Sequence, residues 1–186
     1  MRKSKRFISL VTSLNIIILI TGSVINNLSA AAPSSEIQTL TVAFLYNFMK
    51  LSEWPAGVAD IELTLCIIQA SDYTIDLDSL ADKEIQGHSL KIKHLAQGDS
   101  AQECQLLFIT EEEKPIRVRE WLKNIANKPV LTVSGTDEFL DNGGMIGLVN
   151  DGNHLQFEVN LKRVEQVGIK LSSKMLQIAR AVRVKQ

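Results

Sequence analysis

The feature that most constrains this fold is a regular exchange of short apolar runs with helical patterns in the middle of the chain. Leucine-rich and beta-branched runs at Ile61–Ile68, Gln105–Thr110 and Val130–Ser134 have the length and composition of buried strands. Helical spacing of apolar residues lies between them, over 72–81 and from Glu111 to about 125. Strands that alternate with helices predict a three-layer α/β fold, a mainly parallel sheet with helices on both faces.

The carboxyl-terminal third departs from this alternation. Apolar runs at Met145–Val149 and His154–Val159 flank Asp151-Gly152, which is a strong hairpin signal. We therefore expect an antiparallel hairpin near residues 144–160 as an extension of the sheet.

Three further elements are expected. Leu90–Leu95 alternates apolar and charged residues, which is typical of a strand with one wet face at a sheet edge. Asn160 is expected to cap a helix over 161–167 that Gly168 ends, and Ser172 begins a last helix that runs to Val182.

The first 31 residues have the order of a secretory signal peptide. A basic start is followed by the apolar stretch Phe7–Ile20 and by the small residues of Leu28–Ala32. The rival interpretation is an uncleaved anchor, but the apolar stretch is shorter than the roughly 20 residues of a span. We expect an exported protein, with residues 32–186 as one domain.

Charge argues against a nucleic-acid partner. The chain has 20 basic and 21 acidic residues, and removal of the signal leaves 16 basic residues, a formal charge of −5. Phosphate binding requires a basic surface. Acidic residues gather over 53–84 and basic residues over 162–185. This asymmetry either orients a partner or forms two solvated faces.

The two cysteines, Cys66 and Cys104, both lie in the exported part and permit one pairing. Cys66 is inside one predicted strand and Cys104 precedes another. A disulfide is feasible if the strands are neighbours, and a metal site or a catalytic thiol are the alternatives.

The helix that opens the exported part is apolar nearly all round. Phe44, Tyr46 and Met49 add apolar surface to the stripe that a core requires, and Trp54-Pro55 ends the run. Such a helix is either buried in its own domain or shared with a partner. We expect Phe44, Tyr46 and Met49 to contribute to a contact surface.

Catalytic motifs are absent from the sequence. It contains no nucleophile elbow, no P-loop, no HExxH and no dinucleotide fingerprint. His88, His94 and His154 are far apart, Glu111–Glu113 is typical of a solvated helix start, and Ser172-Ser173 is a helix cap without a placed base. We expect no enzyme activity, no cofactor and no metal.

The motifs taken together resemble the YfiR family of periplasmic proteins over residues 39–183. The opening segment Ala43–Pro55 follows a signal peptide, and the other matching segments occur in the family's order. These are Leu65–Ile67, Cys104–Ile109, Pro129–Ser134, Gly143–Ile146, Phe157–Asn160 and Leu171–Leu176.

The resemblance implies a compact α/β domain that often forms homodimers and has no catalytic activity. The family's namesake represses an inner-membrane diguanylate cyclase by binding its periplasmic sensor segment, and an OmpA-like outer-membrane lipoprotein sequesters it. Cys66 and Cys104 stand where the resemblance places a disulfide. The namesake's second disulfide has no counterpart, because this chain has Gly143, Gly144 and Gly147 in that region.

Two functions from different classes follow. The first is repression of cyclic-di-GMP synthesis through contact with a membrane-bound diguanylate cyclase. The alternative is a periplasmic small-molecule sensor or solute-binding module, with its ligand at the carboxyl ends of the strands.

Overall fold

The computed structural model describes residues 33–58, 62–68, 75–80, 83–152 and 154–184. The chain divides into two units, residues 1–30 and 31–186, and every element described below belongs to the second. The predicted signal peptide lies outside the described residues. None of the described helices combines the length and the apolar character that a bilayer span requires.

The centre of the fold is an eight-stranded sheet with the order β10-β8-β7-β6-β5-β2-β4-β3. Its strands are β2 (Glu62–Ile68), β3 (Glu84–Ile85), β4 (His88–His94), β5 (Leu106–Ile109), β6 (Leu131–Ser134), β7 (Ile146–Asn150), β8 (Leu155–Asn160) and β10 (Ala181–Arg183). All neighbours are parallel except the β7–β8 and β3–β4 pairs. The mainly parallel sheet and the hairpin are confirmed.

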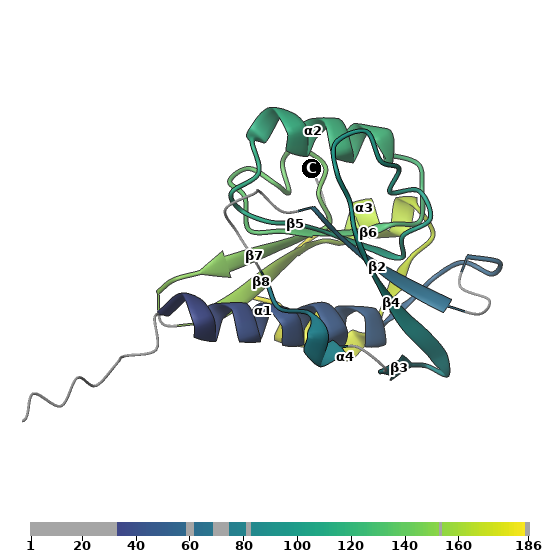
Figure 1. Ribbon diagram of the computed structural model, residues 1–186, viewed down its shortest axis with the longest axis horizontal. Coiled ribbons are helices and arrows are strands. Elements are labelled where there is room, and N and C mark those ends of the chain that lie inside the picture. Colours follow the sequence, from purple (N-terminus) through teal and green to yellow (C-terminus); the bar gives the residue numbers. More distant parts are fainter. Residues whose placement is uncertain (1–32, 59–61, 69–74, 81–82, 153, 185–186) are drawn as a thin grey trace, which may run out of the picture. The chain divides into compact units, whose positions relative to one another are not determined.

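Helices cover both faces of this sheet (Figure 1). Helix α1 (Pro33–Lys50) belongs to a core with Leu63, Leu65 and Ile67 of β2, whereas α2 (Pro115–Asn124) belongs to a second core with Cys66 and Ile68. This division follows from the two-residue period of strand side chains. Two short helices, α3 (Leu161–Gln166) and α4 (Ser173–Ile178), add apolar side chains to the α1 core. The three-layer prediction is confirmed.

The predicted caps of the short helices are confirmed. The Asn160 side chain accepts a hydrogen bond from the Arg163 N–H at the start of α3, and Gly168 follows that helix with φ +79°. The Ser172 hydroxyl accepts one from the Met175 N–H at the start of α4.

Two predicted helices are wrong in extent. Of the helix expected over 72–81, residues 75–80 contain only the 3₁₀ turn η1 (Asp78–Leu80), and 72–74 and 81 lie outside the described residues. Residues 111–113 form a turn, and α2 begins at Pro115, because proline fixes φ and needs no N–H partner in the first turn.

The chain's last segment is a further correction. The helix expected to run to Val182 ends at Ile178, and residues 181–183 form β10 beside β8, with Val182 opposite Val159. A three-residue strand is too short for its two-residue period to compete with a helical pattern that continues through it.

A second, two-stranded sheet was not predicted. It pairs β1 (Ser52–Glu53) with β9 (Lys170–Leu171) and places Glu53 opposite Lys170. The acidic segment around Glu53 and the basic segment around Lys170 therefore lie side by side in this sheet.

The predicted edge position of strand β4 is confirmed beyond Ser89, since β3 pairs only with His88 and Ser89.

Candidate functional site

Cys66 and Cys104 form a disulfide, with Cα atoms 5.8 Å apart. Cys66 lies within β2, and Cys104 lies two residues before β5, the parallel neighbour of β2. Both side chains are buried in the α2 core. The pair is a structural crosslink, and the metal and catalytic-thiol alternatives are wrong.

The structure corrects one of the three predicted contact residues. Met49 is 0% exposed in the α1 core, so it offers no surface to a partner in this fold. Phe44 and Tyr46 are half-buried. The Phe44 ring lies 5.6 Å from that of Phe157 on β8, and the Tyr46 hydroxyl donates to the Glu84 carbonyl at 3.4 Å.

The outer side of α1 is mostly polar or small. Its exposed residues include Glu36, Thr39, Leu40, Ala43, Asn47 and Lys50. Leu40 is the large apolar residue among them, with 39% of its surface exposed. The apolar surface that α1 offers outside its own domain is therefore narrower than its sequence indicates.

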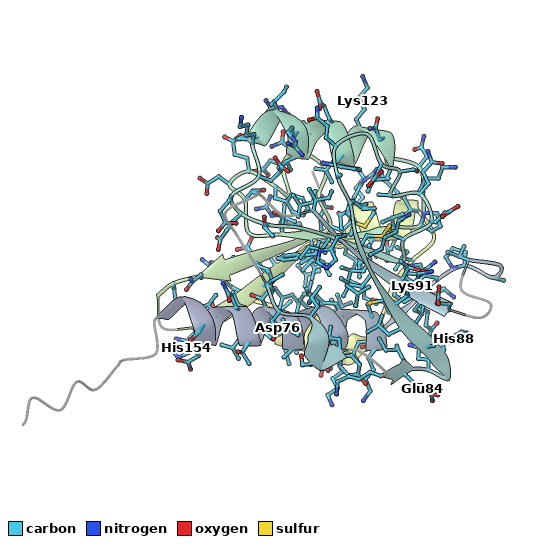
Figure 2. The ribbon with its side chains drawn as sticks, viewed as in Figure 1. Asp76, Glu84, His88, Lys91, Lys123 and His154 are labelled. Carbon is cyan, nitrogen blue, oxygen red and sulfur yellow. A yellow bond between two sulfur atoms is a disulfide. The ribbon has the colours of Figure 1, made fainter. Side chains whose placement is uncertain are left out.

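The histidines do not form a metal site. His88 and His154 lie at opposite ends of the view in Figure 2. His154 is at the tip of the β7–β8 hairpin, with Nδ1 3.7 Å from an Asp151 carboxylate oxygen. Within the described part of the chain, no three His, Cys, Asp or Glu side chains gather closely enough to hold a metal ion.

A pocket of about 400 Å³ lies at the carboxyl ends of β5 and β6. We call it the hairpin pocket, because the β7–β8 hairpin forms one wall. Its lining comes from α1 (Ile37, Thr41), β5 and the turn after it (Phe108, Glu111), the loop after β6 (135–141), the hairpin (147–150, Leu155, Glu158) and Arg183. The carboxyl ends of parallel strands are where open α/β sheets bind ligands.

Acidic side chains dominate the charge of the hairpin pocket. The lining has five carboxylates, those of Glu111, Asp137, Glu138, Asp141 and Glu158, and one guanidinium, that of Arg183. Arg183 lies 2.6 Å from an Asp141 oxygen and 3.3 Å from a Glu158 oxygen. Arg183 therefore offsets Asp141 and Glu158, and it leaves the charges of Glu111, Asp137 and Glu138 uncompensated.

Glu111 is the acid most perturbed by its surroundings. A Cβ on Gly135 would lie 3.2 Å from the Glu111 Oε2, so the glycine lets this carboxylate lie against the loop after β6. Partial burial raises the pKa of Glu111, and repulsion from Glu112 raises it further. A cation beside this carboxylate would oppose both effects.

Sequence reasoning placed a ligand crevice at the carboxyl ends of the strands, but it assigned Glu111 to a helix start and did not name Asp137, Glu138 or Asp141. These four acids lie in the loops that follow β5 and β6, and their convergence depends on which strands are neighbours. The signal that points to Asp137 and Glu138 is their position directly after a buried parallel strand.

A comparison with known protein families matches the YfiR/HmsC-like family over residues 38–180. The chain belongs to this family. No curated protein matches the sequence. The YfiR/HmsC-like match extends from α1 to the residue before β10, so it covers the disulfide and both loops that carry the acids of the hairpin pocket.

The glycine-rich turn of this YfiR/HmsC-like chain has a steric reason. A Cβ on Gly144 would lie 2.4 Å from atoms of the Phe139 ring, which is closer than any real contact. The turn therefore packs directly on a buried aromatic ring of the α2 core. In this region the chain has glycines where the resemblance places the namesake's second disulfide.

Proposed function

We propose that this chain is a non-catalytic periplasmic regulator that binds the periplasmic segment of an inner-membrane diguanylate cyclase and lowers cyclic-di-GMP synthesis. The observation that carries the proposal is the YfiR/HmsC-like match, which covers nearly the whole described fold. The disulfide supports export to an oxidising compartment. Release by an OmpA-like outer-membrane lipoprotein is part of the same proposal.

The mechanism we propose is a population shift. A regulator that binds the inactive conformation of the cyclase more tightly than the active one lowers its output in proportion to that difference in affinity. The candidate contact region is the part of α1 from Leu40, which is exposed, to Phe44, which is half-buried against β8.

Deletion of the gene tests the proposal. We expect cellular cyclic-di-GMP and surface attachment to rise, and both to return when the full-length gene is restored. The tagged protein, recovered from the cell envelope, should retain a membrane protein with a diguanylate cyclase domain. Unchanged cyclic-di-GMP after deletion would remove this function.

The alternative, a small-molecule sensor, is favoured by one observation: the hairpin pocket lies where open α/β sheets bind ligands. A thermal-shift screen against a metabolite panel tests it, since a ligand that binds only the folded state raises the melting temperature in a saturable way. A flat response across the panel would contradict it.

A further inference from the structure

Strand β7 continues beyond the end of its neighbour β6. The two pair only at Val133–Ile146 and Ser134–Gly147, whereas β7 runs on to Asn150 against β8. Over residues 148–150, β7 therefore pairs with only one of the described strands, β8. Residues 147–150 also line the hairpin pocket, so the open side of this strand borders it.

The hydrogen-bond phase of the hairpin determines which backbone groups are open. Residues of an antiparallel pair alternate between those that bond the partner strand and those that point away from it. The Asn160 N–H donates to the Met145 carbonyl at 2.8 Å, and the Asp151 N–H to the His154 carbonyl at 3.2 Å. Counting in twos from these ends, Val149 bonds to β8, and Leu148 and Asn150 point away from it.

The Ser134–Gly147 pair uses one of these groups, because Gly147 itself bonds to β8 and the parallel pairing assigns the Leu148 N–H to the Ser134 carbonyl. The open edge thus offers three groups, the Leu148 carbonyl and the N–H and carbonyl of Asn150. An added strand would bond to these three, as extended peptides do at exposed sheet edges. The pocket lining adds apolar side chains beside this edge, among them Ile37, Phe108 and Leu155.

Charge identifies the kind of strand that fits. The pocket lining has five carboxylates against the single guanidinium of Arg183. A second copy that paired through the same edge would bring two sets of these acids together, which is unfavourable. A foreign segment with a basic side chain would instead meet Asp137 and Glu138 at the pocket.

We propose that the β7 edge at Leu148–Asn150 docks an extended segment of a protein partner that carries an arginine or lysine between apolar residues. The identity of the partner rests on the proposed function; the docking edge itself rests on the strand register and the acidic lining. The small-molecule sensor does not explain the open edge, and it becomes an outcome of the test.

Amide hydrogen exchange followed by NMR tests the docking edge, with the processed protein recovered from the cell envelope. The probe is the peptide Ac-Val-Arg-Val-Arg-Val-NH2 at up to millimolar concentration. We expect the Asn150 amide to exchange rapidly in the free protein and at least tenfold more slowly with the peptide. The Val149 amide, already bonded to β8, is the internal control and should change little.

Two comparison probes decide the occupant. Ac-Val-Glu-Val-Glu-Val-NH2 should not protect the Asn150 amide. Arginine amide alone should also fail, and equal protection by it would replace the docking edge with a small-cation site. No protection by the arginine peptide, or protection already present in a dimer of the free protein, would overturn the inference.

A variant that lacks the Asp137 and Glu138 charges tests whether the acidic lining contributes to binding at the edge. Asp137→Asn with Glu138→Gln should weaken binding of the arginine peptide about fivefold to tenfold, as expected for two rim charges. The matched control is Glu120→Gln with Glu165→Gln, which removes two exposed acids on α2 and α3. The control should bind as the unmodified protein does, and an equal loss in both variants would contradict a local effect.

The same variants separate this inference from the proposed function. Loss of cyclase repression in the Asp137/Glu138 variant but not in the control supports both. Intact repression in that variant, with a normal rise on gene deletion, overturns the edge as the partner site and leaves the proposed function standing. No response to gene deletion removes the proposed function, and the peptide experiment then judges the edge alone.

Discussion

The Cys66–Cys104 disulfide joins β2 to the segment that leads into β5, across 38 positions of sequence. Closing a loop of that length stabilises the folded chain by about 4 kcal/mol when the effect is counted as lost entropy of the unfolded chain. We expect Cys66→Ala with Cys104→Ala to lower the free energy of unfolding by up to that amount, measured by urea denaturation. The unmodified protein in reductant is the control, and an unchanged urea midpoint in both would contradict a structural role.

Glu111 makes stability depend on pH. The pKa of Glu111 in the folded protein is raised above the ordinary 4.5. The stability that the protonated carboxyl contributes is therefore fully present below pH 4.5 and is lost as the pH rises through the pKa of the folded state. A glutamine stays neutral throughout. We therefore expect Glu111→Gln to be more stable than the unmodified protein at pH 7 and equal to it below pH 4.5, in urea titrations across that range.

Glu120→Gln is the control for the pH profile, because Glu120 is an exposed acid on α2. Its stability relative to the unmodified protein should vary little with pH. A Glu111→Gln profile that runs parallel to that of the unmodified protein at every pH would show that burial of the carboxylate has no energetic effect.

Among the secondary-structure elements, those with long or strongly apolar patterns could be predicted from the sequence, and the short ones could not. Strand β5 is apolar at every position and lies in the middle of the sheet, as expected. Strands β1, β9 and β10 have two or three residues each, so their pairing depends on contacts distant in sequence. Helix α2 begins at Pro115 rather than at Glu111, because acidic residues favour a helix start without requiring one.

The opening helix shows where periodicity is insufficient for predicting function. Its extra apolar residues suggested a surface shared with a partner, yet Met49 faces the core and Tyr46 is covered by the segment around Lys83 and Glu84. The pattern does not show that strand β3 and its flanks extend the core around the helix. Leu40 remains as the exposed apolar position on α1.

A charge at Leu40 tests α1 as the contact element. We expect Leu40→Glu to weaken retention of the cyclase and raise cyclic-di-GMP, with the melting temperature changed by no more than a few degrees, since the side chain is exposed. Ile116→Glu is the matched control, because Ile116 is exposed on α2, on the other face of the sheet. Equal loss in both variants, or in neither, would contradict α1 as the contact element.

For the molecule as a whole, the charge asymmetry along the sequence does not become two separate faces. The β1–β9 pair joins the acidic and basic segments, and Arg180 and Arg183 lie beside Glu158. What remains is the acidic lining of the hairpin pocket, formed by loops that the sequence count did not single out. Counting charges along the chain could not find it, because the sheet order brings those loops together.

We propose that the exported protein forms a homodimer, and the described surface predicts that it is weak. Four large apolar side chains are exposed among the described residues, Leu40, Ile116, Ile178 and Val184, whereas permanent dimers bury a large apolar interface. The expected dissociation constant is therefore micromolar, which corresponds to a free energy of association on the order of −8 kcal/mol.

Sedimentation velocity from about 1 to 100 μM should show a shift from monomer to dimer. Ile178→Glu should move that shift to higher concentration than Ile116→Glu does, because Ile178 is exposed and lies three residues before β10, the strand at one end of the sheet. A monomer at every concentration would contradict the dimer.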